Sequence, residues 1–297
     1  MQSILARLRE RGPFFDICGL HGASTALLLS RAVEVLHKTI CCILPADEHL
    51  ELLAQDLAFF SSCRVLIYPS YEIPPYTPLS PDPSTVCQRL ATLYQLQDAS
   101  RPCILLTSAE AVLRRVLPAA ALGRHSELVI ANEEIDREAL ISSLTAGGYQ
   151  ICDMVRQEGD MAVRGGLIDI FPPALDAELS GPLRLDFFGD ILENIRLFDP
   201  VSQRSRQTLE EAVLLPASES LFPDQEHRGA WLEFLRKNVD EHQWGARSAR
   251  NLHERLRSGQ RFPGIEFFLP LIYGDQQQLQ SVFDYLPADG LLMVADA

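Results

Sequence analysis

The sequence of 297 residues predicts an α/β protein: a parallel α/β core built from two chain segments, with an inserted α+β domain that contains an antiparallel sheet. Runs that are apolar throughout alternate with amphipathic helical patterns in residues 1–118, and a similar run recurs near residue 291, which together predict the core. In residues 119–212 two strand patterns instead flank a two-residue turn, which is typical of an antiparallel hairpin. We therefore expect three parts, 1–118, 119–212 and 213–297.

The first part predicts a buried parallel sheet with helices on both faces. A strand that is apolar along its whole length has both faces covered, as in a parallel sheet. Residues 69–83 interrupt the pattern with six prolines and no Lys or Arg, which predicts a rigid surface loop rather than a platform for bases. Strands are expected at 14–18, 40–44, 65–68 and 103–106, and helices at 24–37, 47–61 and 84–97.

The second and third parts follow different patterns. Residues 126–212 carry 7 basic against 17 acidic side chains, so we expect a separate acidic domain. Its expected elements are a helix at 133–146 and strands within 161–171 and at 183–187 and 191–198. The third part predicts helices at 225–237 and 246–257 and a buried strand at 291–294. Because the chain stops where such a strand normally leads into a functional loop, we expect a fragment of a longer protein.

Composition excludes several classes of function. With 47% hydrophobic residues the chain can bury a core, and a net charge of -14 argues against binding bare nucleic acid or an anionic membrane. No apolar run reaches the roughly 18 residues of a membrane span, and the first residues lack a signal-peptide pattern. The seven cysteines form no C-x-x-C pair and predict buried, reduced thiols. We expect a cytoplasmic, monomeric chain.

The turn at residues 19–26 lies where a phosphate-binding loop would connect strand and helix. Such a loop needs a Lys for the phosphates and a Ser or Thr for Mg²⁺. Aligned on Gly19 and Gly22, these positions hold Thr25 and Ala26, and Ser24 replaces a third glycine. Backbone N–H groups alone attract an anion only weakly. We therefore expect a degenerate P-loop-like core without nucleotide or other cofactor.

The sequence offers no constellation for catalysis. It contains neither G-x-S-x-G nor H-E-x-x-H. His37 and Cys41 lack the two further ligands of a metal site, so no metal is expected. Asp186 and Asp190 are interpreted as solvated surface acids rather than a catalytic pair. We expect no catalytic residue and no enzymatic activity in this chain.

The predicted hairpin carries the most informative pattern. Because side chains alternate between the faces of a strand, Arg184 and Phe188 should point away from the core, and so should Arg164 in the strand before them. Exposed aromatic rings beside arginines are typical of protein-binding hot spots. Two alternatives remain open: the turn covers Phe188, or the arginines only pair with surface acids.

These residues belong to a pattern that covers nearly the whole chain. It resembles the nucleotide excision repair protein UvrB, and more closely the N-terminal UvrB-homologous module of bacterial transcription-repair coupling factors (Mfd). No single motif is specific, but the joint pattern is. The motifs are Tyr71–Tyr76 (YEIPPY), Val163–Pro172 (VRGGLIDIFP), Arg184–Asp190 (RLDFFGD), Gly264–Phe267 (GIEF) and Asp284–Pro287 (DYLP).

Three departures from UvrB favour the coupling factors. The P-loop at residues 24–26 is degenerate, whereas UvrB keeps an intact one. A short proline-rich loop near residues 76–83 replaces the DNA-gripping hairpin of UvrB. Asp296 stands alone where UvrB has an acidic Walker B pair.

The resemblance implies a non-catalytic module that recruits the damage-recognition ATPase UvrA to stalled transcription complexes through its inserted domain. It maps contacts with UvrA onto Arg164, Arg184 and Phe188. Motor and RNA polymerase-binding domains of the family lie outside these residues, so RNA polymerase and DNA are partners of other domains, and those domains are candidates to mask the docking residues. The alternatives are a UvrB-like, ATP-dependent, DNA-binding repair enzyme and direct DNA binding.

Overall fold

A computed structural model describes residues 2–9, 14–75, 77–176, 180–222, 228–241, 246–274 and 279–295. Tyr76 and Asp296, which belong to motifs named above, lie outside the described residues. The chain divides into two compact units, each assembled from separate segments. Unit 1 consists of Met1–Ser70, Gln95–Arg114 and Ser281–Ala297, and unit 2 of Tyr71–Tyr94 and Arg115–Gln280.

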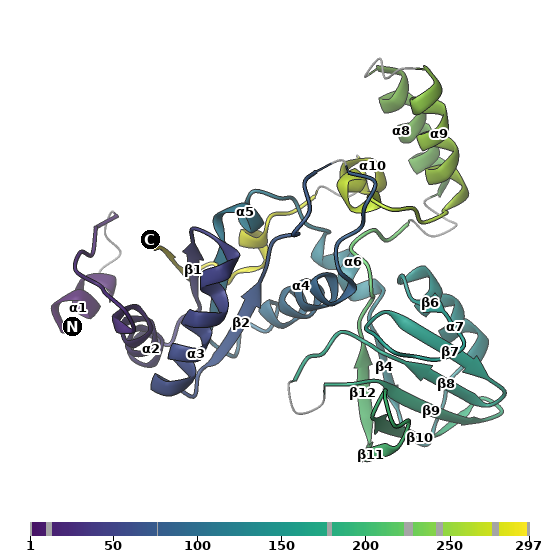
Figure 1. The fold of residues 1–297 in the computed structure, drawn as a ribbon, viewed down its shortest axis with the longest axis horizontal. Coiled ribbons are helices and arrows are strands. Elements are labelled where there is room, and N and C mark those ends of the chain that lie inside the picture. Colours follow the sequence, from purple (N-terminus) through teal and green to yellow (C-terminus); the bar gives the residue numbers. More distant parts are fainter. Residues whose placement is uncertain are drawn as a thin grey trace. The chain divides into compact units, whose positions relative to one another are not determined.

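Unit 1 contains a parallel sheet of four strands in the order β13-β1-β3-β2. The last strand, about 250 residues after β1 in the sequence, pairs with it in parallel, and Figure 1 shows this yellow strand beside the purple one. The prediction of a parallel core built from two chain segments is therefore confirmed. The strands are β1 (Ile40–Leu44), β2 (Arg64–Tyr68), β3 (Cys103–Ser108) and β13 (Leu291–Val294).

Helices α2 and α3 pack against one face of this sheet. Leu29 and Leu57 contribute from the helices and Ile104 from the sheet to one buried cluster. The α-helices described in unit 1 are α1 (Gln2–Arg9), α2 (Ser24–Leu36), α3 (Leu50–Phe60) and α5 (Ala109–Val112), with 3-10 turns η1 (Asp47–His49) and η3 (Val282–Tyr285). Helix α4 (Pro83–Leu96) lies mostly in unit 2.

The strand predicted at residues 14–18 is wrong. These residues form no strand, and Phe14 is fully exposed. A strand needs a paired neighbour, and residues 14–18 pair with none of the strands in the order β13-β1-β3-β2. The loop at residues 19–23 therefore leads into α2 without the strand that precedes a functional P-loop.

Unit 2 contains a seven-stranded sheet in the order β11-β10-β9-β8-β7-β6, with β5 also paired to β10. Its neighbours are antiparallel except for β6 and β7. This confirms the predicted antiparallel sheet and its hairpin. The strands are β5 (Glu133–Glu134), β6 (Gln150–Ile151), β7 (Asp160–Arg164), β8 (Leu167–Ile170), β9 (Leu183–Phe188), β10 (Ile191–Phe198) and β11 (Ser205–Leu209); β4 (Glu127–Ile130) pairs separately with β12 (Glu211–Leu214).

One face of this sheet is covered by helix α7 (Arg137–Ala146). Leu140 and Leu144 from the helix join Leu185 and Ile195 of the sheet in one buried cluster. The helix begins where the Asp136 carboxylate accepts a hydrogen bond from a backbone N–H in its first turn (2.9 Å). On the opposite face of the sheet, Ala162 and Phe198 are buried in a second, smaller cluster with Val155.

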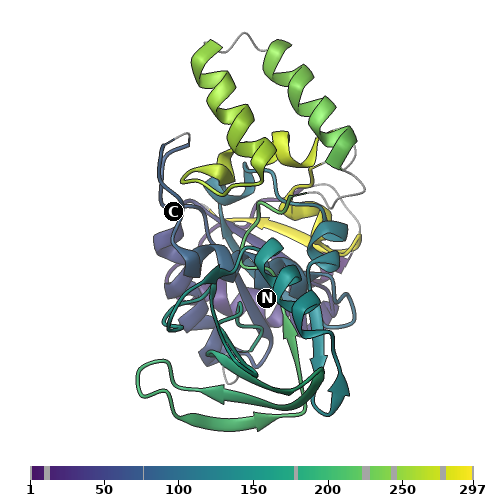
Figure 2. The same cartoon turned by 90° about the vertical axis from the view of Figure 1, so that its right-hand side faces the viewer.

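The remaining helices of unit 2 are α6 (Ala119–Arg124), α8 (Arg228–Glu241), α9 (Ala246–Ser258) and α10 (Leu269–Tyr273), with a 3-10 turn η2 (Ile265–Phe268). Figure 2 shows α8 and α9 as two helices side by side. The helices predicted in this region are confirmed over their described residues. Among the described residues, no helix combines the length and apolarity that crossing a bilayer requires.

The compact units do not follow the boundaries expected at residues 118 and 212, so the three-part division stays a prediction.

A buried ion pair joins distant segments of unit 2. The Arg89 Nε donates a hydrogen bond to the Glu219 carboxylate (2.6 Å), and both side chains are completely buried. The guanidinium lies over the ring of Tyr71, 4.4 Å from its centroid, and the Tyr273 hydroxyl donates to the Glu219 backbone carbonyl (2.8 Å). The proline-rich loop therefore does not lie wholly on the surface, because Tyr71 at its start is part of the interior.

We expect Arg89→Ala to lower the free energy of unfolding by about 3–5 kcal/mol, because it leaves the Glu219 carboxylate buried without its cation. Urea denaturation of the full chain measures the loss. Arg101→Ala, at an exposed arginine, is the matched control and should change stability by about 0.5 kcal/mol or less. The double variant Arg89→Met, Glu219→Leu should recover most of the loss, and a decrease below about 1 kcal/mol in Arg89→Ala contradicts the role given to the pair.

Candidate functional site

The candidate site is the face of the seven-stranded sheet opposite α7. Along β9, Leu183, Leu185 and Phe187 are buried, whereas Arg184 is half-buried and Phe188 exposed. The predicted alternation along this strand is therefore confirmed. The strand register pairs residues of neighbouring strands that lie on this same face. Arg164 of β7 lies opposite Leu167 of β8, and Phe188 lies opposite Ile191 of β10.

Arg184 is held in place by a buried carboxylate. Its Nε and Nη2 donate to the two oxygens of Asp169 at 2.6 and 2.8 Å, and Asp169 lies directly opposite it on β8. The guanidinium also lies over the Phe198 ring, 4.8 Å from its centroid. The hydrogen bonds that Arg184 donates to the Asp169 carboxylate raise the pKa of Arg184, which keeps it charged. One alternative is that the arginines only pair with surface acids. Arg184 does pair with an acid, but this acid, Asp169, is buried and fixes the orientation of the guanidinium.

A second ion pair lies beside the first. Asp186 accepts a hydrogen bond from the Arg196 Nη2, and its side chain is largely buried. The interpretation of Asp186 as a solvated surface acid is therefore wrong, whereas Asp190 in the turn is exposed. The cross-strand register explains the difference, because β10 brings a guanidinium over the face on which Asp186 lies.

Phe188 is the most exposed member of an apolar patch on this face. The ring is 74% exposed, so the alternative in which the turn covers it is wrong. Ile191, directly opposite, is 47% exposed, and Leu167 on the same face is 37% exposed. We call Arg164, Leu167, Arg184, Phe188 and Ile191 the docking face. Sequence reasoning missed Leu167 and Ile191, although a two-residue turn already places residue 191 opposite residue 188.

Three features keep the edge of the docking face in position. The exposed Arg164 donates through Nη2 to the Asp153 backbone carbonyl. In the turn between β7 and β8, a Cβ at Gly166 would lie 2.5 Å from the Phe187 carbonyl oxygen, so only glycine permits this close approach. Arg137 donates to the Gly165 carbonyl (2.6 Å) and ties the same turn to α7. The docking face therefore stands on a rigid backbone.

The degenerate phosphate loop uses its polar groups internally. Gly19 and Gly22 both have positive φ. The Ser24 hydroxyl accepts from the His21 N–H (2.6 Å) and donates to the His21 carbonyl (2.8 Å), so it caps its own turn. Ala26, at the position of the Mg²⁺ ligand, is completely buried. Thr25 is half-buried and brings no charge.

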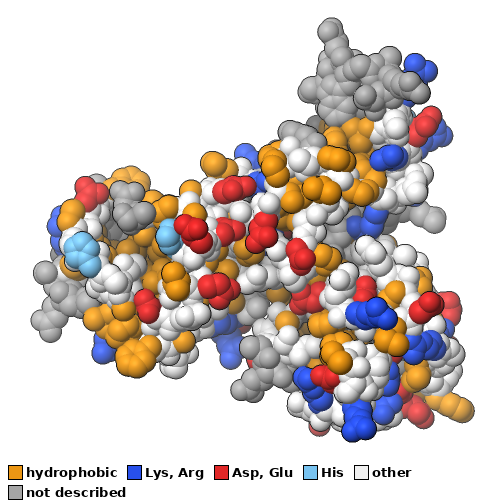
Figure 3. Space-filling view, viewed as in Figure 1, with side chains coloured by type: hydrophobic (Ala, Val, Ile, Leu, Met, Phe, Trp, Pro, Cys, Tyr) orange, Lys and Arg blue, Asp and Glu red, His pale blue; other side chains and the backbone are white. Residues whose placement is uncertain are grey.

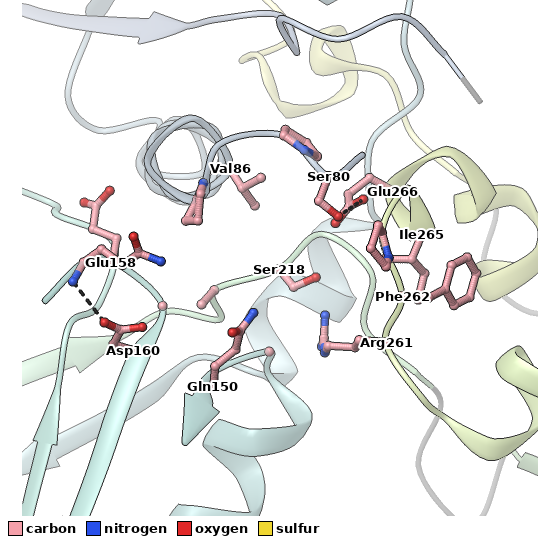
Figure 4. Close-up of a pocket in the computed structure, with 17 residues that line it drawn as sticks. Ser80, Val86, Gln150, Glu158, Asp160, Ser218, Arg261, Phe262, Ile265 and Glu266 are labelled. Carbon is pink, nitrogen blue, oxygen red and sulfur yellow. Dashed lines mark hydrogen bonds between the residues drawn. The ribbon is translucent and has the colours of Figure 1, made fainter. Parts of the chain in front are cut away.

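Unit 2 also contains a cavity of about 340 Å³ that sequence reasoning did not anticipate. Figure 4 shows Glu158 on one side and Arg261 and Glu266 on the other. Burial, with a smaller contribution from Asp82, raises the pKa of Glu158 to about 7, and burial also raises the pKa of Glu266. Arg261 donates to the Ala146 carbonyl (3.1 Å), and Ser80 donates to Glu266 (3.1 Å).

The remaining candidates for a reactive site in the described part of the chain are metal-ligating groups and cysteine thiols. The groups of His, Cys, Asp and Glu found there do not form a cluster that could hold a metal ion. Burial raises the pKa values of the Cys41 and Cys42 thiols to about 12, so these thiols stay protonated. The sequence predicts buried cysteines, but Cys18 is exposed.

Comparison with known proteins shows which family and which relatives this chain resembles. Residues 129–219, which contain the docking face, match the UvrB interaction domain family. The chain is 36% identical over 275 residues to the transcription-repair-coupling factor of Myxococcus xanthus, covering 90% of this chain and 22% of the relative. It is 31% identical to that of Escherichia coli K12 (92% and 23%) and 28% to that of Bacillus subtilis 168 (99% and 25%).

These matches define the chain as a UvrB-homology module that includes a UvrB interaction domain. It belongs to the family of transcription-repair-coupling factors, which are DNA repair proteins. The chain spans between 22% and 25% of the length of the curated relatives named here.

The raised pKa of Glu158 predicts a pH-dependent stability. Because the folded-state pKa is about 7 and the ordinary value is 4.5, stability is lost as the pH rises through this interval. Glu158→Gln removes the buried charge, so we expect its Tm to exceed that of the wild type by roughly 2–4 °C at about pH 8 and to match it at about pH 5. Glu210→Gln, at an exposed carboxylate, is the control. Equal Tm values at both pH values contradict the expectation.

Proposed function

We propose that this chain is a non-catalytic interaction module that binds UvrA through the docking face and so recruits it for nucleotide excision repair. The observation that carries the proposal is Phe188, an aromatic ring 74% exposed beside arginines, within the residues that match the UvrB interaction domain. Exposed aromatic and arginine side chains dominate the binding energy of protein interfaces.

The docking face is prepared for binding before the partner arrives. Arg184 is already oriented by Asp169, and Phe188 stands on a paired strand. Less conformational entropy is therefore lost on association than with groups on a flexible loop. Leu167 and Ile191 extend the apolar area around the ring.

The chemistry of the face indicates what the partner presents. Phe188 requires an apolar recess, and Arg164 requires an acceptor at its edge. Within the described residues, Arg164 donates to a neutral backbone carbonyl, so a carboxylate of the partner would form a stronger, charge-assisted bond. UvrA is expected to offer such a recess bordered by acidic groups.

Support for a non-enzymatic role comes from residues 19–26. The Lys and Mg²⁺ positions of a P-loop hold Thr25 and Ala26, and Ser24 is engaged in its own turn. Because this chain covers only 22% of the Myxococcus xanthus relative, we propose that contacts with RNA polymerase and DNA translocation belong to the parts it does not cover. Other domains of a complete coupling factor would regulate the module by covering the docking face.

Substitutions on the docking face test UvrA binding. We expect Phe188→Ala and Arg164→Ala each to weaken the affinity roughly 30-fold or more, or about 2 kcal/mol. Titration calorimetry with purified UvrA measures it. Val201→Ala, at an apolar side chain 92% exposed in another turn, is the control and should leave the affinity unchanged. Unchanged affinity in both docking-face variants would overturn the proposal.

Arg184 needs a different variant. Arg184→Ala would leave the Asp169 carboxylate buried without its cation, so a loss of binding could reflect a damaged fold. The double variant Asp169→Asn, Arg184→Gln removes both charges and retains hydrogen-bonding groups. We expect it to keep the wild-type Tm within a few degrees and to lose roughly 10-fold or more in UvrA affinity.

The alternative, a UvrB-like ATP-dependent enzyme, makes an opposite prediction. A nucleotide that binds the folded state raises its stability by about 2.7 kcal/mol at 100 times its Kd. We expect ATP with Mg²⁺ at millimolar concentration to leave the Tm unchanged within error. A rise that Ser24→Ala or Gly22→Val abolishes would favour the enzyme.

A further inference from the structure

The helical pair α8–α9 reverses the charge of the chain. Residues 228–261 contain eight Lys and Arg against four Asp and Glu, a net charge of +4, whereas all other residues together carry -18. Seven of the eight cations are arginines, whose planar guanidinium groups match phosphate oxygens better than an ammonium group does.

Five of these cations lie on the solvent side of the described parts of the pair, whereas Arg261, which follows α9, lines the cavity. Arg236 and Lys237 of α8 and Arg250, Arg255 and Arg257 of α9 are all exposed. Figure 3 shows Lys and Arg side chains in blue over the described parts of these helices.

The apolar side of the pair is already used for packing. Trp231, Leu235 and Leu256 are buried, and the Trp231 Nε1 donates to the Leu271 carbonyl of α10 (2.7 Å). The Arg228 side chain donates to the Arg257 carbonyl (2.8 Å), which joins the two helices.

From this arrangement we propose that the exposed cations of α8–α9 bind the phosphate backbone of duplex DNA. DNA carries one charge per roughly 1.7 Å of its axis. Arg250 and Arg257 lie seven residues apart on one side of α9, roughly 10 Å at about 1.5 Å per residue, so both can meet phosphates of one stretch of duplex. The surface carries no feature that reads bases, so the binding is independent of sequence.

An acidic protein surface is the competing occupant, and the composition of the helices favours DNA. Protein interfaces are anchored by exposed aromatic or aliphatic side chains. Among the described residues of α8 and α9, no large apolar side chain is exposed, whereas the docking face has three. Interfaces with DNA are polar and strongly positive and need no apolar anchor.

The overall charge of -14 does not oppose this binding at moderate salt. Charges further away than the Debye length, about 10 Å at 0.1 M, are largely screened, so the local cations determine the interaction. The net charge that argues against DNA binding in the sequence is an average over surfaces of opposite sign.

The test is the fluorescence anisotropy of a labelled 20-base-pair duplex, titrated with the full chain between about 50 and 200 mM salt. We expect saturable binding at low salt. Arg236→Gln, Arg250→Gln, Arg257→Gln should weaken it at least 10-fold and reduce the slope of log K against log salt by about 2–3, since each phosphate contact contributes about 0.9. The control Arg101→Gln, Arg115→Gln, Arg204→Gln removes three exposed arginines elsewhere and should stay within twofold of the wild type.

Three results would overturn the proposal: no saturable binding by the wild type at low salt, equal losses in the two triple variants, or displacement of the duplex by polyglutamate at lower charge equivalents than by unlabelled DNA. Arg250→Gln alone, expected to reduce the salt slope by about 1, provides the answer if the triple variant unfolds. UvrA affinity should be unchanged in the α8–α9 variants, so this proposal and the docking face can fail independently.

Discussion

The buried pair of Arg89 and Glu219 is the constraint on which unit 2 depends. Its two residues are 130 positions apart, and neither charge has access to water. Such a pair costs desolvation energy that only close geometry and further hydrogen bonds offset, so the segments that supply them must assemble together. The stacked Tyr71 and the hydroxyl of Tyr273 provide these contacts, which join the proline-rich loop, α4, the segment after β12 and α10.

The two sides of the antiparallel sheet have different roles in the docking face. Leu185 and Ile195 bury the inner side under α7, and this packing fixes the backbone from which Phe188 projects. On the outer side Asp169 holds Arg184 in one orientation. A rigid sheet with few oriented groups loses little entropy on association, which is the physical reason for placing a protein-binding surface there.

The two proposed surfaces differ in the chemistry of recognition. The docking face combines exposed apolar side chains with oriented arginines and suits a protein recess, whereas α8–α9 exposes arginines without an apolar anchor and suits phosphates. A single chain can carry both because screening confines each field to its own surface.

The sequence by itself determined the alternation of α2, β1, α3, β2, α4 and β3, the buried pattern of the last strand and the outward direction of Phe188, because these follow from local periodicity. It also carried the family resemblance. Only the tertiary structure decided that residues 14–18 form no strand, that Asp186 and Arg184 have ion-pair partners, and that Arg89 meets Glu219. These outcomes depend on which strands and side chains become neighbours across long stretches of chain, and local patterns do not contain that information.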